Sequence, residues 1–147
     1  MCLIAIAFQL LEDCPVAVAS NREEFFDRPS TTPTIEQARV DGKKTRRFVC
    51  GLDQRASGTW LGVNDAGLFV AVTNRYHEQI PPNPRSRGLL CTELLLLPTA
   101  AEAADRAETE FATGQYAGAN FICLDRTAGY IIHGGTEIRR SQLTPGL

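Results

Sequence analysis

Short apolar segments separated by polar links open the chain. Leu3 to Leu10 is rich in Ile and Phe, and Pro15 to Ser20 alternates Val with Ala. The link between them, Glu12 to Pro15, is polar and ends in proline. Because links of this kind join paired strands, the first twenty residues predict a β-hairpin.

A polar stretch follows before the strand pattern returns. Residues 21–47 contain Pro29, Pro33 and Gly42 and have weak periodicity, which predicts an extended loop with room for one short helix. Apolar, β-branched and aromatic residues predict strands at 48–51, 59–63 and 68–73. The link Asn64 to Gly67 predicts a hairpin turn, because Asn, Asp and Gly tolerate a positive φ.

The second half of the chain begins with helix signals. Ser86 has the character of an N-cap, and Arg87 to Leu97 carries leucines on one helical face. After Pro98, residues 100–112 are rich in Ala and Glu and predict a second helix. Strands are expected at 120–124, 129–133 and 137–141.

This order of elements predicts an α+β fold with an antiparallel sheet and a helical layer. The length of 147 residues corresponds to one domain, residues 1–147. The final Thr144-Pro145-Gly146-Leu147 is typical of a turn that leads into another element. We therefore expect the front portion of a larger domain, inactive alone, with an exposed sheet edge that favours a homo-oligomer.

Composition and charge narrow the class of protein. A chain with 44% hydrophobic and 22% charged residues is globular, and a net charge of −2 argues against a nucleic-acid partner. No apolar run approaches the roughly 18 residues of a membrane span. Five cysteines without a C-x-x-C pair argue against a disulfide framework or a zinc knuckle. A cytoplasmic location is expected.

Cys2 is the first candidate for chemistry. Removal of Met1 would give Cys2 a free α-amine with a pKa of about 7.7–8.0, close to that of an ideal base at neutral pH. A thiol paired with its own N-terminal amine is a known activated nucleophile. The alternative is that Cys2 only fills space, as buried thiols commonly do.

The segment Asn21 to Glu24 is the second candidate, because a hairpin returns the end of its second strand beside residue 2. Arg22 would then lower the pKa of the Cys2 thiol, and Glu23 would accept a hydrogen bond from the α-ammonium. The alternative is a solvated charged turn. Asn74 ends an apolar strand, so it is either an oxyanion donor or a strand terminator.

Other residues offer less chemistry. Trp60 favours a core position over a ligand platform. His77 and His133 have no second ligand at metal spacing and no Ser-His-Asp arrangement, so neither a metal site nor a serine triad is expected. No cofactor is expected.

The order of these motifs resembles one known family. Met1-Cys2 is followed by further short motifs: Asn21-Arg22-Glu23-Glu24-Phe25, Arg28-Pro29, Gly58 to Asn64, Gly67, Thr73-Asn74-Arg75 and Ser86-Arg87-Gly88. The chain resembles the NRDE protein family, which includes the transport and Golgi organisation 2 group. Glu23 stands where the family's Asn-Arg-Asp-Glu tetrad has Asp.

The resemblance implies a fold and a set of site residues. The family is similar to N-terminal nucleophile (Ntn) hydrolases, four-layer αββα proteins such as choloylglycine hydrolase and penicillin V acylase, which cleave amides with an N-terminal Cys. This resemblance implies that Cys2 is the nucleophile and that Arg22 is the arginine beside it. It also implies that Glu23 is the acidic partner of the α-amine and that Asn74 donates a hydrogen bond to the oxyanion. Asn21, Trp60 and Asn64 are the candidates for substrate contact.

Two functions compete on this basis. The first is an amidohydrolase that cleaves a linear, non-peptide C–N bond of a small amide or acyl substrate through an acyl-enzyme. The alternative is a non-enzymatic protein that binds or traffics haem or an acylated lipid, with Cys2 as a soft ligand or a relic.

Overall fold

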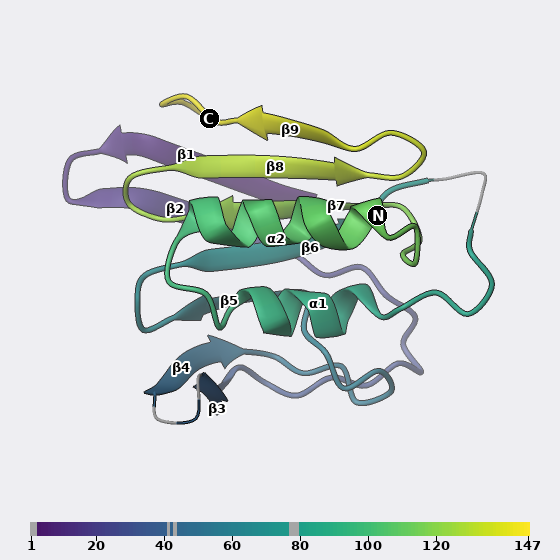
Figure 1. Cartoon of the computed structure of the whole chain (residues 1–147). Coiled ribbons are helices and arrows are strands. Elements are labelled where there is room, and N and C mark those ends of the chain that lie inside the picture. The colour runs from purple at the N-terminus through teal and green to yellow at the C-terminus, as the bar shows by residue number, and fades with distance from the viewer. Residues whose placement is uncertain (1–2, 41, 43, 77–79) are drawn as a thin grey trace.

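The computed structural model describes residues 3–40, 42, 44–76 and 80–147, and these form two antiparallel sheets and two helices (Figure 1). The elements in chain order are β1 (Leu3–Leu11), β2 (Cys14–Asn21), β3 (Thr34–Val40), β4 (Lys44–Cys50), β5 (Leu61–Asn64), β6 (Phe69–Asn74), α1 (Arg87–Leu94), α2 (Ala100–Ala112), β7 (Ala119–Leu124), β8 (Gly129–Gly134) and β9 (Arg139–Gln142).

The larger sheet is a meander of seven strands, β3 to β9, in which each strand pairs with the next along the chain. β6 and β7 are neighbours even though α1 and α2 lie between them in the sequence. The two helices therefore lie across one face of the sheet, where α1 packs on β6 and α2 packs on β7 and β8. The expected α+β class with antiparallel sheets is confirmed.

The β1–β2 hairpin covers the opposite face of this sheet. Successive side chains of a strand point to opposite faces, and Phe121 packs with the helices whereas Ile122 packs with the hairpin. The hairpin contributes an apolar set to this second contact: Ile4, Ile6, Val16 and Val18. The described residues thus form three layers, with the helices, the large sheet and the hairpin in that order (Figure 1).

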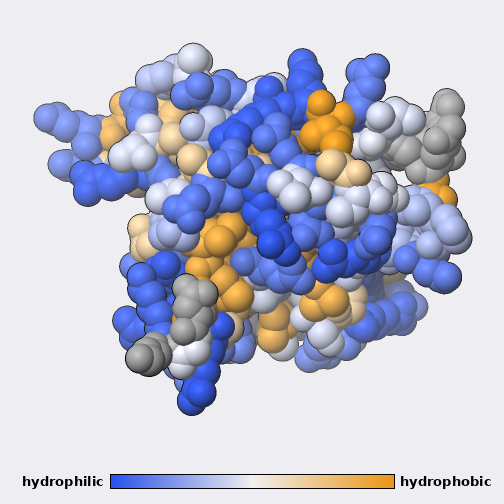
Figure 2. Space-filling model, viewed as in Figure 1, coloured by the Kyte–Doolittle hydropathy of each residue, from blue (hydrophilic) through white to orange (hydrophobic). Residues whose placement is uncertain are grey.

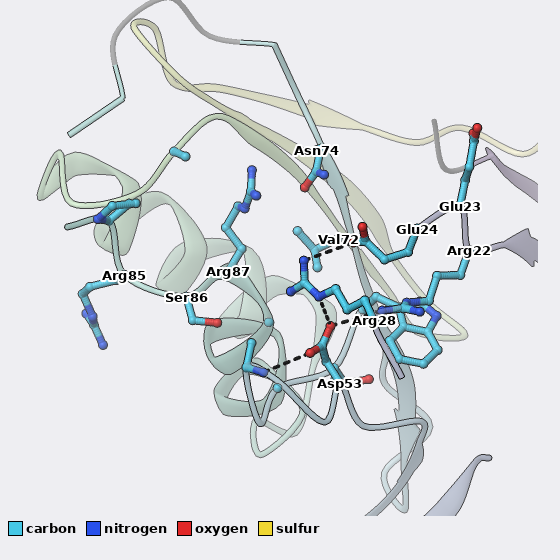
Figure 3. A pocket seen from close by; sticks show the side chains of 17 residues that line it. Arg22, Glu23, Glu24, Arg28, Asp53, Val72, Asn74, Arg85, Ser86 and Arg87 are labelled. Carbon is cyan, nitrogen blue, oxygen red and sulfur yellow. Dashed lines mark hydrogen bonds and ion pairs between the residues drawn. The ribbon is translucent and has the colours of Figure 1, made fainter. Parts of the chain in front are cut away.

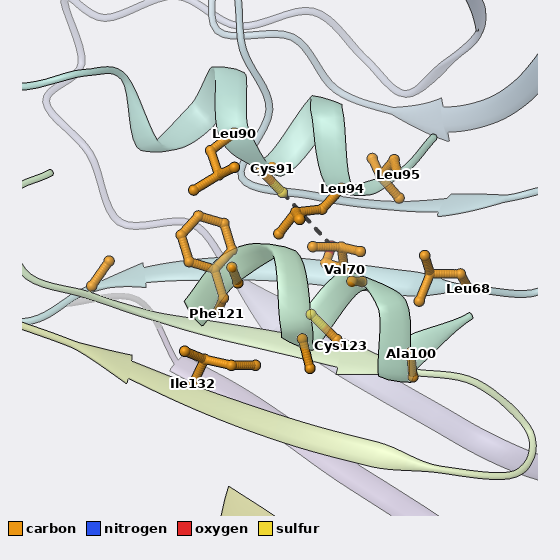
Figure 4. Close-up of a cluster of buried hydrophobic side chains, with 14 of the residues drawn as sticks. Leu68, Val70, Leu90, Cys91, Leu94, Leu95, Ala100, Phe121, Cys123 and Ile132 are labelled. Atoms are coloured by element: carbon orange, nitrogen blue, oxygen red, sulfur yellow. Dashed lines mark hydrogen bonds between the residues drawn. The ribbon is translucent and has the colours of Figure 1, made fainter. Parts of the chain in front are cut away.

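The main core lies between the helices and the sheet. Leu90 and Leu94 of α1 are fully buried against Val70 of β6, and Phe121 lies beside them (Figure 4). The outer side of the helices is mostly polar, with small separate apolar patches (Figure 2). The leucine pattern predicted the burial of Leu90 and Leu94 in the first helix, whereas Leu89 of the same predicted face is exposed.

The expected loop over residues 21–47 is wrong in its second half, which forms β3 and most of β4. β3 is the edge strand of the sheet, and only its alternate residues, such as Ala38, are partly buried. The strand is held by its backbone pairing with β4, from Thr34↔Cys50 to Val40↔Lys44. Such pairing leaves little hydrophobic pattern in the sequence.

The first helix is shorter than expected, because α1 ends at Leu94 and Leu95 is its C-cap. The amide groups of Leu96 and Leu97 bond to carbonyls three residues back, which is a tight turn. Pro98 disfavours a helical Leu97, so the leucine pattern continues past the true end of the helix. The hairpin at the N-terminus, the Ser86 cap and the bounds of α2 are confirmed.

Candidate functional site

The hairpin brings the end of β2 to the start of β1, as expected. Asn21 pairs with Leu3 in the antiparallel register, so the segment that follows Asn21 begins beside the start of the first strand. Cys2, the proposed nucleophile, lies outside the described residues. The role of Arg22 and Glu23 toward a thiol at that position stays a prediction.

A pocket of about 280 Å³ opens next to this end of the hairpin (Figure 3). Five separate parts of the chain line it: the segment after β2, the loop before β5, the end of β6, the start of α1 and the link between α2 and β7. The polar and charged residues of the lining include Arg22, Glu23, Glu24, Arg28, Asp53, Asn74, Arg85, Ser86 and Arg87. Four of the expected site residues, Arg22, Glu23, Trp60 and Asn74, therefore share one cavity.

Asp53 holds the charged side of the pocket together. Its Oδ2 atom lies 3.1 Å from Nη2 of Arg22 and 2.7 Å from Nε of Arg28. Its Oδ1 atom accepts the backbone amides of Arg55 and Ala56 at 3.0 and 2.9 Å. Burial raises the pKa of the Asp53 carboxyl, but these amides and the charge of Arg28 outweigh that effect and lower the pKa below its ordinary value.

Arg22 is fixed from two sides. Besides its ion pair with Asp53, its guanidinium lies over the Trp60 ring, 4.6 Å from the ring centroid. Trp60 is partly buried and lines the pocket, so it serves as a platform for an arginine as well as a packing residue. These two contacts hold the Arg22 guanidinium in one orientation at the open end of the hairpin.

The other expected contacts have different positions. Asn74, exposed at the end of β6, lines the pocket, whereas Asn21 pairs with Leu3 and is outside the lining. Asn64 is buried, and its Nδ2 atom donates to the carbonyls of Leu95 and Leu97, both at 2.8 Å. The Asn64 side chain is therefore engaged inside the fold and does not line the pocket.

The start of α1 forms the facing wall. The Ser86 side chain accepts the Leu89 amide, and the Arg87 Nη1 atom donates to the Gly118 carbonyl at 2.9 Å. A Cβ atom added to Gly58 would lie 2.2 Å from the backbone of Gly88, so only glycine lets the loop before β5 approach the helix this closely. This contact locks two walls of the pocket together.

The described cysteines other than Cys14 are buried. Burial raises the pKa of the Cys50 and Cys91 thiols and raises that of Cys123 to about 12. These three thiols are therefore mostly protonated at neutral pH. Cys14 is exposed in the hairpin.

The pocket residues that were not singled out as site residues from the sequence include Arg28, Asp53 and Arg87. Arg28 and Arg87 belong to short motifs that carry the family resemblance, and that was the available signal. No sequence signal marked Asp53, because its role depends on a loop that brings it to Arg22, 31 residues earlier in the chain.

The described parts of the chain hold neither a cluster of metal-binding side chains nor a helix suited to cross a membrane. In these ranges, no three or more His, Cys, Asp or Glu side chains gather as metal ligands would. No helix within the same ranges combines the length and the apolar character that a membrane crossing requires.

The fold and pocket thus define an α+β protein with a small, charged pocket at the open end of a hairpin. The sequence comparisons give the family: the model described as "Transport and Golgi organisation 2" matches residues 1–146, so the chain belongs to this family.

Individual relatives are similar over a shorter segment of 81 residues. The chain is 36% identical there to "Transport and Golgi organization 2 homolog" of Mus musculus and 33% identical to "Transport and Golgi organization protein 2 homolog" of Homo sapiens. The Bos taurus homologue is 31% identical. Each match covers 53% of this chain and 27% of the relative, so it spans about a quarter of the relatives' length.

Proposed function

We propose that this chain binds a small acyl-bearing molecule in the pocket beside the hairpin, in keeping with the word transport in the names of its relatives. The mixed lining of the pocket carries this proposal. Trp60, Val72, Pro84 and Ala117 supply apolar surface next to the arginines and carboxylates. A lining of that kind suits a ligand with an acyl part and a polar head.

The size of the pocket limits the ligand. Small-molecule pockets commonly have volumes of about 300–1,000 Å³, and this one has about 280 Å³. It would enclose a polar head and a short acyl segment. A haem, the other ligand expected from the family resemblance, would extend well outside it.

Calorimetric titration with N-octanoylglycinamide tests the binding proposal. Ala117→Trp fills the pocket without changing its charge, and we expect it to weaken binding at least tenfold. Ala112→Trp, at an exposed position at the end of α2, is the matched control and should leave binding unchanged. Equal affinity in both variants would contradict the proposal, and a Soret shift on haem titration that Ala117→Trp abolishes would favour haem instead.

Hydrolysis of an acyl amide in the same pocket is the second candidate, favoured by the shared location of Arg22, Glu23 and Asn74. In this scheme the Cys2 thiolate attacks the amide carbonyl, and the α-amine passes the thiol proton to the leaving amine. Water then cleaves the thioester and releases the acid. Asn74 would donate to the oxyanion, so Asn74→Ala should lower kcat about 10²–10³-fold with little change in KM.

Mapped alkylation with iodoacetamide at pH 7 tests the nucleophile before any substrate is known. We expect Cys2 to react faster than Cys14, whose exposure makes it the internal reference. Arg22→Ala should slow the labelling of Cys2 and leave Cys14 unchanged. Equal rates at both cysteines, or an N-terminus that retains Met1 in the native host, would exclude the hydrolase.

The αββα architecture is part of the same proposal. A helix layer, a seven-stranded sheet and a two-stranded sheet stack in the order that such a sandwich requires. An experimental structure of a longer family member with helices on the outer face of β1 and β2 would support this architecture. Solvent on that face would contradict it.

A further inference from the structure

Arg87 differs from the other arginines of the pocket in its partners. Its Nη1 atom donates to the Gly118 carbonyl, and no carboxylate of the described residues lies within ion-pair distance of it. The side chain is partly buried. Burial lowers the pKa of Arg87, and the charge of nearby Arg28 lowers it further.

The other three arginines are compensated. Arg22 and Arg28 share Asp53, and Arg28 also pairs with Glu24 at 3.2 Å. Arg85 pairs at 2.6 Å with Glu110, which lies in α2. The positive charge of Arg87 is thus the one in the lining without a described counter-charge.

A partly buried cation without a counter-ion is costly, and an anionic group in the pocket would remove that cost. The charge balance indicates which anion fits. Arg87 carries one positive charge that has no described counter-charge, so a singly charged group matches it, whereas a phosphate dianion would exceed it. Guanidinium groups bind carboxylates through paired, charge-assisted hydrogen bonds.

We propose that Arg87 is the anion-binding residue of the pocket and that the natural ligand carries a single carboxylate at this position. This inference rests on the proposed function and names the class of its ligand. Arg87 enters from the start of α1 and Asn74 from the end of β6 (Figure 3), so the carboxylate would lie at the α1 side of the cavity, away from the Asp53 cluster.

Three probes test the assignment in the full chain by calorimetric titration: N-octanoylglycine, its uncharged counterpart N-octanoylglycinamide, and octyl phosphate. The carboxylate should bind at least tenfold more tightly than the amide, and rising NaCl should reduce that advantage. Octyl phosphate should bind more weakly than N-octanoylglycine at pH 7.5. Tighter binding of the phosphate would overturn the carboxylate assignment.

Variants separate the charge of Arg87 from its structural hydrogen bond. Arg87→Gln keeps a donor for the Gly118 carbonyl. It should lower the affinity for N-octanoylglycine at least tenfold and change the affinity for N-octanoylglycinamide less than twofold. Arg87→Lys should recover part of the affinity. Arg126→Gln, at an exposed position in the turn between β7 and β8, is the control and should leave both affinities unchanged.

The two levels of proposal fail in different ways. If neither acyl probe binds the wild-type chain, the proposed function is wrong and Arg87 has no ligand of this class. If both probes bind equally and Arg87→Gln affects neither, the pocket binds acyl groups but Arg87 is not its anion site. Thermal unfolding of each variant shows whether a loss of affinity reflects a loss of fold.

Discussion

At the scale of single residues, the pocket depends on Asp53, whose side chain is 11% exposed and binds two arginines through one oxygen. Asp53→Asn removes that charge and leaves Arg22 and Arg28 without it. Because both arginines are partly solvated, we expect a loss of about 1–3 kcal/mol in the free energy of unfolding, less than for a fully buried pair. Asp27→Asn, whose carboxylate is 75% exposed, should cost below about 0.5 kcal/mol.

The stabilisation by Asp53 should depend on pH in one direction. Because the pKa of Asp53 is lowered by folding, its contribution is complete above the unfolded value of about 3.9 and is lost as the pH falls through the folded value. Urea unfolding of wild type and Asp53→Asn should therefore differ by a constant amount from pH 7 to about pH 5 and converge below about pH 4. A difference that grows on acidification would contradict the assigned role.

The sequence could identify only part of this constellation. Arg22 and Glu23 were predictable because a hairpin has one geometry at its open end, and Asn74 because a polar residue ended an apolar strand. Asp53 was not, since its place follows from a loop whose path is set by the Gly58–Gly88 contact. Asn64 shows the reverse error, because a buried structural amide and a ligand-binding amide have the same appearance in a sequence.

At the scale of elements, Asn64 links the β5–β6 turn to the end of α1. Its Nδ2 atom donates to two carbonyls after α1, and its Oδ1 atom accepts the amides of Ala66 and Leu68. Asn64→Ala leaves the buried Leu95 carbonyl and Leu68 amide without this partner, so we expect a loss of about 3 kcal/mol in the free energy of chemical unfolding. Gln37→Ala, an exposed amide on β3, is the control, and binding of acyl probes to folded Asn64→Ala should be unchanged.

The same scale shows which elements a sequence can reveal. α2 has a helix-favouring composition, a Thr99 cap and one buried face, so propensity, capping and burial agree on its bounds. β3 has an exposed Ile35 and a partly buried Glu36, which is the opposite of a hydrophobic pattern facing a core. Its place at the sheet edge comes from backbone pairing with β4, which the local pattern of hydrophobic residues does not predict.

At the scale of the whole molecule, the hairpin is a separate layer whose two ends are attached in different ways. Its apolar side chains pack on the sheet through Ala71, Ile122 and Leu124. Near its turn, Phe8 exchanges two backbone hydrogen bonds with Gly146, at 2.9 and 3.0 Å. The end that carries Leu3 and Asn21, next to the pocket, has no backbone hydrogen bond to the large sheet among the described residues; besides the apolar contact, it is held by the side-chain ion pair of Arg22 with Asp53.

This asymmetry predicts different effects from two substitutions in one interface. Ile4→Ala loosens the pocket end of the hairpin, whereas Val16→Ala, opposite Phe8, loosens the end that Gly146 holds. Hydrogen exchange should show faster exchange of β1 and β2 in Ile4→Ala while β7 keeps its protection, because the hairpin opens without global unfolding. Ile4→Ala should also lower the affinity for the acyl probes several-fold, whereas Val16→Ala should leave that affinity unchanged. Equal loss of protection in all strands of both variants would show that the hairpin and the sheet unfold as one unit, and that the pocket has no independently mobile wall.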